Sequence, residues 1–455
     1  MPSTREDLDA LIEQRAQYLK EVNRQMEHWR AVDARLEMVY QGLAALSNHS
    51  GASIQPNRSL LHDLRERIGG LIKGHNQLAV RFARQSVTIG VTGQARSGKT
   101  ALLRSLSGVL EYDWPPTGVR FRLDHTKGRL RAMVELHSAA SFLEEVVSPL
   151  HRELGFGAPA NLDEFDAFRY PDATEMRALE WPVLIRLLSL QSSLTSYRDD
   201  LIAGVKEVPF GELRSYMANP VRTDVQETRK HAAVRGIRIE CRFPHDDLSG
   251  LSVVDVVWPS GMGLDASRRL ADALRAEVDA VLLVKRPTAF WSLQDSQALS
   301  LLSEAAGPIT RVEDFVYIVA TRGDGDSVGL VAAMQEELRR VLNNDEAGRV
   351  PAVWQVNQHS RDDIGTHVLT PLLACLAERL PGMDRDLLGG GSAEASALTP
   401  IVRREIAAFM DFLPRLLPPF ADRAGNDIQR AQLLGELSAV LRQLTQDLGS
   451  DALSP

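Results

Sequence analysis

Residues 87–103 read VTIGVTGQARSGKTALL, and this stretch decides the fold. It begins with alternating apolar residues, continues into a glycine-rich turn and ends in a second apolar run. The alternation predicts a strand, and the run ALLRSL after the turn predicts a helix. The turn itself, GQARSGKT, fits the pattern G-x-x-x-x-G-K-[ST] throughout, and it lies between a strand and a helix as that pattern requires.

The residue types in this turn suit a bound phosphate. Glycines let the backbone wrap an anion with amide hydrogens pointing inward, and the start of the next helix offers its positive end. We expect Lys99 to reach the outer phosphates and Thr100 to ligate Mg²⁺. The expected nucleotide contacts here are Gly93, Gln94, Ala95, Arg96, Ser97, Gly98, Lys99, Thr100 and Ala101. A chance match is the alternative, and the flanking strand and helix count against it.

The ends of two later strands predict how the base of the nucleotide is bound. The segment DFVYIVATRGDGD ends an apolar strand with Thr321, Arg322 and Asp324. A carboxylate at Asp324 can accept two hydrogen bonds from guanine, whose donor pair adenine lacks, and the stem of Arg322 can cover the base. In AVWQVNQHSRDDIG, Asn357 either closes the other side of the base or caps a turn. A solvated loop is the alternative for the first segment.

Two further segments are candidates for the metal and the attacking water. Asp255 ends an apolar strand in LSVVDVVWPSGMG, where a carboxylate holds Mg²⁺ through water unless it is a buried structural residue. Gly261 then lies near the outer phosphate in a switch segment. In DWPPTGVRF, Thr117 follows the first helix of the domain, where a threonine reaches Mg²⁺ and the water, with Thr126 as the fallback.

The order of periodic segments predicts an α/β domain. Apolar strand candidates lie at 130–136, 234–241, 251–257, 280–284, 315–320 and 352–356. Helical patterns separate most of them, which favours a P-loop NTPase domain over residues 86–385 with a mainly parallel sheet. Residues 151–230 interrupt this rhythm and predict a helical insertion.

Helical stripes occupy both ends of the chain. Residues 1–85 predict a helical hairpin with a turn at 49–57, and residues 386–455 predict a C-terminal helical segment after a linker at 384–397. We expect the two ends to pack as one helical bundle. The run FMDFLPRLLPPF at 409–420 predicts an interhelical corner, with a membrane-touching tip as the alternative.

The composition is that of a soluble globular protein. The 455 residues are 44% hydrophobic and 25% charged, and the formal net charge is −8. With no basic stripe, nucleic acid is not expected as a partner. Cys241 and Cys375 match no metal-ligand spacing and are expected to pack as small hydrophobes. Without a signal-peptide core or a run of ~18 apolar residues, we expect a cytoplasmic protein, with peripheral membrane binding as the alternative.

These segments, in this order, resemble the dynamin-like superfamily of large GTPases over about residues 86–380. GQARSGKT resembles its phosphate loop, PPTG its first switch, VVDVVWPSG its second, TRGD its guanine motif and VNQHSRDDIG its final base-contacting stretch. The resemblance implies Mg²⁺-dependent hydrolysis of GTP to GDP, nucleotide-gated homodimers or oligomers and often membrane remodelling. The N-terminal hairpin is similar to bacterial members, and to a bacterial virulence-associated family that begins with helices before a phosphate loop.

Three departures limit what the resemblance implies. Pro259 and Gly261 lie farther from Asp255 than the usual D-x-P-G of the second switch, which affects how water is positioned. Arg96 resembles the guanylate-binding-protein and atlastin branch, where this arginine is an internal finger, although it can equally point to solvent. The tail is short, with no lipid-binding domain. A GTP-dependent scaffold with little hydrolysis and an ATPase therefore stay open, as does a protein or membrane partner for the bundle.

Overall fold

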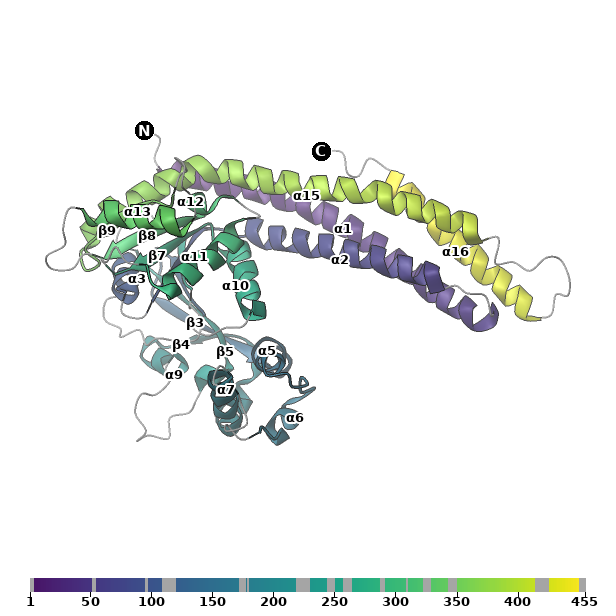
Figure 1. The fold of residues 1–455 in the computed structure, drawn as a ribbon, viewed down its shortest axis with the longest axis horizontal. Helices are drawn as coiled ribbons and strands as arrows, with labels where there is room; N and C mark the ends of the chain where they lie inside the picture. Colours follow the sequence, from purple (N-terminus) through teal and green to yellow (C-terminus); the bar gives the residue numbers. More distant parts are fainter. Residues whose placement is uncertain are drawn as a thin grey trace. The chain divides into compact units, whose positions relative to one another are not determined.

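The computed structural model describes residues 4–50, 55–94, 97–108, 120–171, 177, 180–217, 230–243, 250–256, 264–286, 291–307, 310–321, 329–342, 350–413 and 425–449. The chain divides into two compact units. The first contains Met1–Asp9 and Gln85–Leu380, and the second contains Ala10–Arg84 and Pro381–Pro455. Figure 1 shows the helices and strands of both.

Within the described residues, a nine-stranded sheet of order β4-β3-β5-β2-β6-β1-β7-β8-β9 forms the first unit's centre. Its strands are β1 (Val87–Gly93), β2 (Arg120–His125), β3 (Arg131–Ser138), β4 (Ile202–Val208), β5 (Val234–Cys241), β6 (Leu251–Asp255), β7 (Ala280–Lys285), β8 (Val316–Thr321) and β9 (Val353–Val356). Strands β6, β1, β7, β8 and β9 are parallel, and β2 is parallel to β5. The antiparallel pairs are β2–β6, β3–β4 and β3–β5. The predicted α/β fold with a mainly parallel sheet is confirmed.

The central strands are buried along their whole length. Every residue of β7 (AVLLVK) and of β8 (VYIVAT) is buried, and in β1 only Gly93 is partly exposed. Continuous apolar strands of this kind are typical of parallel sheets covered on both faces. These strands are therefore the ones that the sequence predicts most clearly.

Helices connect the strands of this unit. They are α3 (Lys99–Ser107), α4 (Ala139–Phe142), α5 (Ser148–Glu153), α6 (Leu162–Ala167), α7 (Trp181–Ser192), α8 (Leu194–Tyr197), α9 (Leu213–Met217), α10 (Leu264–Glu277), α11 (Leu293–Ala306), α12 (Val312–Phe315), α13 (Leu330–Val341) and α14 (Arg361–Ile364). π-Helical turns cover Leu143–Val147 and Gly365–Leu369.

The region predicted as a purely helical insertion, 151–230, also contains a strand. β4 pairs antiparallel with β3 at one edge of the sheet, and all of its residues except Val208 are exposed. The prediction was wrong here because β4 shows no buried apolar alternation. Strand β2 was missed as well. In its RFRLDH sequence Phe121 and Leu123 do alternate with charged residues, but two apolar residues are too few to make the pattern clear.

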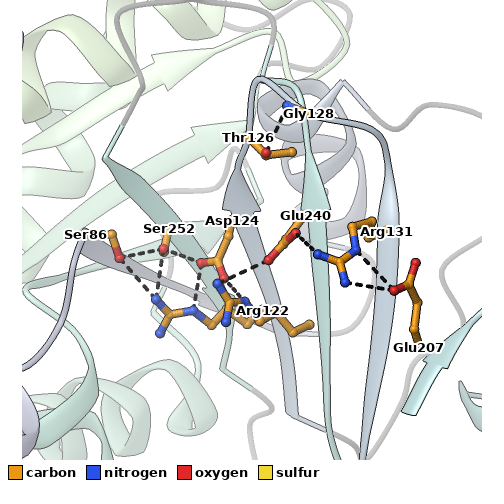
Figure 2. Close-up of polar contacts among 10 residues, drawn as sticks. Ser86, Arg122, Asp124, Thr126, Gly128, Arg131, Glu207, Glu240 and Ser252 are labelled. Carbon is orange, nitrogen blue, oxygen red and sulfur yellow. Dashed lines mark hydrogen bonds and ion pairs between the residues drawn. The ribbon is translucent and has the colours of Figure 1, made fainter. Parts of the chain in front are cut away.

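One face of the antiparallel half of the sheet is polar (Figure 2). Arg122 in β2 donates hydrogen bonds to Asp124 (2.8 Å), Ser86 (3.1 Å) and Ser252 (3.0 Å). Ser86, Asp124 and Ser252 are buried, and the two serine hydroxyls lie 2.7 Å apart. Asp124 also accepts a hydrogen bond from Ser252 and pairs with Arg238 in β5. The buried carboxylate is therefore paired with the guanidinium groups of Arg122 and Arg238.

The same polar face continues to the sheet edge. Arg131 in β3 lies 2.8 Å from Glu207 in β4 and 3.5 Å from Glu240 in β5 (Figure 2). The charges thus alternate across neighbouring strands and neutralise one another.

The second unit is a helical bundle. It contains α1 (Thr4–Ser50) from Ala10, α2 (Gln55–Phe82), the part of α15 (Thr370–Phe412) from Pro381, and α16 (Gly425–Gly449). Figure 1 shows these helices running alongside one another. They share one buried core, whose members include Trp29, Leu36, Leu43, Leu61, Ile68, Val402, Ile406, Phe409, Leu437, Leu441 and Leu444. The apolar stripes of both chain ends therefore meet in a single bundle.

The predicted linker at 384–397 and turn at 49–57 need correction. Helix α15 runs through the whole glycine-rich segment, while α1 extends to Ser50 and α2 begins at Gln55, with 51–54 outside the described residues. Glycine costs about 1 kcal/mol in a helix, so tertiary packing must compensate in α15. At Gly391 an added Cβ would lie 3.1 Å from Leu78 of α2, which shows that glycine permits a close approach of the helices. The apolar corner expected at 409–420 lies largely outside the described residues.

A buried ionic cluster also anchors this part of α15. Asp384 accepts hydrogen bonds from Nε of Arg15 in α1 (2.6 Å) and from Nε of Arg81 in α2 (3.0 Å). All three side chains are almost inaccessible to solvent. A carboxylate held by two guanidinium groups fixes the register of three helices at one level of the bundle.

Candidate functional site

The GQARSGKT turn follows β1 at the carboxyl edge of the parallel strands. β1 lies between β6 and β7 and is parallel to both, with Gly93 opposite Val284 of β7. Strands that follow β1 in the sequence therefore lie on both sides of it in the sheet. In open α/β sheets, this reversal of strand order is where ligands bind, beyond the carboxyl ends of the strands.

The two glycines of the pattern are required by close contacts. Gly98 has φ 94°, and an added Cβ would lie 2.7 Å from Cγ2 of Thr321. At Gly93 an added Cβ would lie 2.4 Å from the carbonyl oxygen of Val284. Any side chain at either position would displace the turn from the ends of β7 and β8. The sequence pattern and the geometry therefore agree at both positions.

The end of the turn is held from two sides. The amide of Ser97 donates to the carbonyl of Gln94 (3.1 Å), and the hydroxyl of Thr321 donates to the carbonyl of Ser97 (3.1 Å). Ser97 is 3% exposed, and its own hydroxyl has no hydrogen-bond partner within the described part of the chain. A buried hydroxyl without a partner costs free energy, which an anion bound in the turn would recover.

Lys99 is the first residue of α3 and lies beside the end of β6. Its Nζ is 2.7 Å from Oδ1 of Asp255, and the two side chains are 20% and 17% exposed. The structure therefore brings together the residue expected to bind phosphate and the carboxylate expected to bind metal. α3 is preceded by Gly98 without a side-chain cap, which leaves its first amides for a ligand.

The predicted metal donors are oxygen atoms, as Mg²⁺ prefers. Thr100 supplies a hydroxyl beside Lys99, and Asp255 supplies a carboxylate at the end of β6. No group of three His, Cys, Asp or Glu side chains suited to a metal ion occurs among the residues with described positions. This donor set fits an ion that keeps several waters and binds with phosphates, which is how Mg²⁺ binds beside nucleotides.

Sequence reasoning missed a polar cluster beside the start of the turn. The side-chain amide nitrogen of Gln94 donates to the hydroxyl of Ser292 (2.7 Å) and to the carboxylate of Asp295 (2.8 Å). Asp295 also pairs with Lys285 at 2.9 Å. The only sequence signal was the spacing of Ser292 and Asp295, which form a reciprocal capping box at the start of α11.

On the base side, two predicted residues have structural tasks. The hydroxyl of Thr321 braces the turn, as described above. The side chain of Asn357 is exposed, and its Oδ1 accepts a hydrogen bond from the amide of His359 (3.0 Å), which is the turn-capping alternative. The adjacent Gln358 carbonyl accepts a hydrogen bond from Ser105 of α3 (3.0 Å). The turn after β9 is thus tied to the helix that follows the phosphate loop.

Several predicted site residues lie outside the described residues. They are Ala95, Arg96, Thr117, Gly261, Arg322 and Asp324. The roles given to them remain predictions. The fallback residue Thr126 is described, and its hydroxyl accepts a hydrogen bond from the Gly128 amide (3.0 Å) after β2 (Figure 2).

The fallback role of Thr126 was wrong. Strand β2 is antiparallel to β6 with Asp124 opposite Ser252, so β2 ends at the amino edge of β6. The turn at Gly93 lies at the opposite edge, where β1 and β6 end. A threonine two residues beyond Asp124 is therefore on the wrong side of the sheet to contact a phosphate bound there.

The two cysteines have no place in this site. Burial raises the pKa of the Cys241 thiol to about 12, with the nearby Asp124 carboxylate as a second cause, so it stays protonated. Cys375 is a partly buried residue of α15. Both are free thiols, as the prediction of small packing residues requires.

Comparison with known proteins gives a similarity at the level of structure. No protein-family model and no curated protein sequence matches the chain. Two solved structures of an oligomerised bacterial dynamin pair, described as providing a mechanism for long-range sensing and tethering of membranes, are similar to it. The first is 13% identical with a TM-score of 0.40 over 97% of this chain and 52% of that chain. The second is 11% identical with a TM-score of 0.40 over 95% and 76%. The chain thus spans about half the length of the first structure.

Proposed function

We propose that the chain is a Mg²⁺-dependent GTPase of dynamin-like type. The observation that carries this proposal is the turn after β1, where Lys99 meets Asp255 and the buried hydroxyl of Ser97 has no hydrogen-bond partner among the described residues. The Lys99 ammonium group, the Ser97 hydroxyl and the uncapped start of α3 all lie at the carboxyl end of the parallel strands. Together they suit the phosphates of a nucleoside triphosphate.

Hydrolysis in this site is in-line attack of water on the terminal phosphate. Lys99 and the loop amides stabilise phosphate charge, and Thr100 with Asp255 would hold Mg²⁺, which neutralises the charge that develops between the outer phosphates. Thr117 is proposed to orient the water. Arg96 is proposed to reach over the outer phosphates as an internal finger, a role that suits its planar guanidinium group.

Guanine selectivity is proposed to come from Asp324, three residues beyond the end of β8. Thr321 supports this arrangement because its hydroxyl joins β8 to the phosphate loop. The end of β8, which Asp324 follows in the sequence, is thereby tied to the phosphate loop. An ATPase is the outcome to be expected if Asp324 makes no contact with the base.

Nucleotide-dependent self-assembly is part of the proposal and rests on the resemblance of the motifs. The related structures are described as oligomerised and as tethering membranes. For this chain we propose GTP-dependent homodimers or oligomers in the cytoplasm, with the bundle as the surface for a protein partner or a membrane. None of the helices in the described segments is long and apolar enough to cross a bilayer.

Calorimetry with GTP, ATP and xanthosine triphosphate in competition tests the binding, and release of phosphate tests the hydrolysis. We expect Mg²⁺-dependent GTP binding and measurable phosphate release. Binding without release would favour the scaffold reading, which the unusual spacing of Pro259 and Gly261 motivates. Preference for ATP would overturn the guanine assignment, and no nucleotide binding would overturn the proposal.

A further inference from the structure

The carboxylate of Asp295 is shared by groups from three parts of the chain. Its Oδ1 accepts a hydrogen bond from Gln94 (2.8 Å), and its Oδ2 accepts one from Lys285 (2.9 Å) and one from the amide of Ser292 (3.0 Å). Asp295 is only 6% exposed. Capping of α11 requires the contacts with Ser292 alone, so those with Gln94 and Lys285 need a different explanation.

The partners of Gln94 fix the orientation of its side-chain amide. A carboxylate can only accept hydrogen bonds, so the amide nitrogen of Gln94 must face Asp295. That nitrogen also donates to the hydroxyl of Ser292 (2.7 Å). The backbone carbonyl of Gln94 in turn accepts the hydrogen bond from Ser97 that closes the loop. Holding the Gln94 side chain therefore holds the residue from which the loop is closed.

Lys285 ties the polar cluster around Asp295 to the end of strand β7. It follows Val284, which pairs with Gly93, so its backbone lies beside the start of the loop. Its ammonium group is buried and lies 5.1 Å from the centre of the Trp291 ring. A buried ammonium is retained only with a close anionic partner, and Asp295 is that partner.

We propose that Asp295 is a positioning residue for the phosphate loop. It acts through Gln94, and it holds the loop in register with the strand end that carries Lys285. The proposal deepens the function proposed above and rests on it for its nucleotide-binding readout. Asp295 itself is not assigned any contact with the nucleotide.

Amide hydrogen exchange of the full-length chain, followed by mass spectrometry, tests the positioning without nucleotide. Gln94→Met keeps the length of the side chain and removes its hydrogen bonds, while the pairs of Asp295 with Ser292 and Lys285 remain. Losing a hydrogen bond to a charged group should speed exchange in the loop by about tenfold or more. Exchange at the start of α11 should not change. Unchanged exchange in the loop would overturn the proposal.

An exchange of partners separates positioning from simple helix capping. Gln94→Glu places two carboxylates against each other, so loop protection and Mg·GTP affinity should both fall by about tenfold or more. Adding Asp295→Asn lets the amide introduced at 295 donate to the carboxylate introduced at 94. The double variant should recover most of both losses relative to Gln94→Glu alone. No recovery, with the double variant folded, would overturn the positioning role of Asp295.

A matched control and the parent chain complete the test. Ser303→Ala removes a hydroxyl that donates to the Leu299 carbonyl within α11, and should leave loop exchange unaltered. If the parent binds no Mg·GTP, the proposed function fails. Amide exchange in the phosphate loop of the Gln94→Met variant still decides whether the contact with Asp295 positions the loop, because that measurement needs no nucleotide.

Discussion

Lys99 and Asp255 form an ion pair of 2.7 Å between the first residue of α3 and the last residue of β6. Each group therefore neutralises the other at the carboxyl edge of the sheet. In the proposed complex with Mg·GTP, a phosphate would pair with Lys99 and the magnesium ion with Asp255. Each residue would then exchange its present partner for a group of opposite charge on the ligand. Nucleotide without metal would leave Asp255 beside the phosphates as a like charge.

Replacing Lys99 by alanine should abolish detectable Mg·GTP binding while the chain stays folded. The lysine is a point charge for the phosphates, and its partly exposed pair with Asp255 contributes only about 1 kcal/mol to stability. Calorimetry with a non-hydrolysable GTP analogue measures the affinity, and thermal unfolding measures the fold. Lys127→Ala, at an exposed lysine after β2, is the control and should bind normally. Retained affinity in Lys99→Ala would remove the phosphate-loop assignment.

Asp324→Asn should change which base is preferred. An amide presents a donor where a carboxylate accepted. The affinity for GTP should therefore fall, and the affinity for xanthosine triphosphate should rise. The loss expected for GTP is about 1–3 kcal/mol, as for a buried hydrogen-bonding group left without its partner. Competition binding of the two nucleotides and ATP measures the preference. If the substituted protein keeps the parent's order of preference, Asp324 does not bind the base.

Gly98→Ala should weaken both the fold and nucleotide binding. The substitution requires an alanine at φ 94° with its Cβ 2.7 Å from Thr321. A strained residue of this kind costs about 1–3 kcal/mol, and moving the turn away would misplace the loop amides. Chemical denaturation and calorimetry measure the two effects.

Gly435→Ala is the matched control for that substitution. An added Cβ there meets nothing within 4 Å, and the residue lies inside α16. The control should stabilise the protein by up to about 1 kcal/mol because alanine favours a helix over glycine. A destabilised control together with a neutral Gly98→Ala would contradict the contact geometry.

Asp384→Ala should destabilise the helical bundle strongly. It leaves the buried guanidinium groups of Arg15 and Arg81 without the carboxylate that holds both. Removing one member of a buried ionic cluster costs about 3–5 kcal/mol. Urea denaturation followed by far-ultraviolet circular dichroism measures the change, because the bundle is made of long helices. Asp386→Ala removes an exposed carboxylate two residues away and should change stability by less than about 0.5 kcal/mol.

The insertion should lose stability in mild acid through His151. Burial lowers the pKa of His151 from its ordinary value of 6.5, and the hydrogen bond to the Gly157 carbonyl only partly opposes this. The unfolded chain therefore binds the proton more readily than the folded one. The stability that the neutral ring contributes is complete above pH 6.5 and is lost as pH falls below that value.

Hydrogen exchange of residues 148–170 at pH 7 and pH 5, corrected for intrinsic rates, measures this loss. Faster corrected exchange at pH 5 is expected in the parent. In the His151→Phe variant this pH dependence of exchange should disappear, provided that exchange at pH 7 shows that the insertion is still folded. A histidine ring titration by nuclear magnetic resonance gives an independent check, since a midpoint at or above 6.5 would contradict the assignment.

The parts of the fold that the sequence predicted are those in which one pattern decides the structure. Strands β1, β7 and β8 are continuous apolar runs, and the turn between Gly93 and Gly98 has a pattern that only a few backbone conformations satisfy. By contrast, the linker expected near Gly391 proved helical. Its glycines predict a break, and only contacts with residues more than 300 positions away in the chain, such as Asp384 with Arg81, offset them.

The candidate site shows the same division. The strand-end position of Asp255 and the motif position of Lys99 are visible in the sequence, so their meeting could be expected. The contribution of Asp295 could not, because it depends on the strand order that sets β7 beside β1. A capping box at Ser292 signals only a helix start, and nothing in it specifies that Gln94 is the neighbour.

Strand β4 forms the outer edge of the sheet, and its backbone limits what can join it. Ile202 and Val205 are 71% and 67% exposed, which would suit the addition of a further strand from another chain. However, Ala203 has φ 57° and Gly204 has φ 119°, so the extended run is interrupted next to Ile202, while Lys206 and Glu207 bring charge to the remainder. Kinks and charges of this kind protect edge strands from aggregation. The edge therefore keeps neighbouring copies from fusing into a continuous sheet when the protein is concentrated.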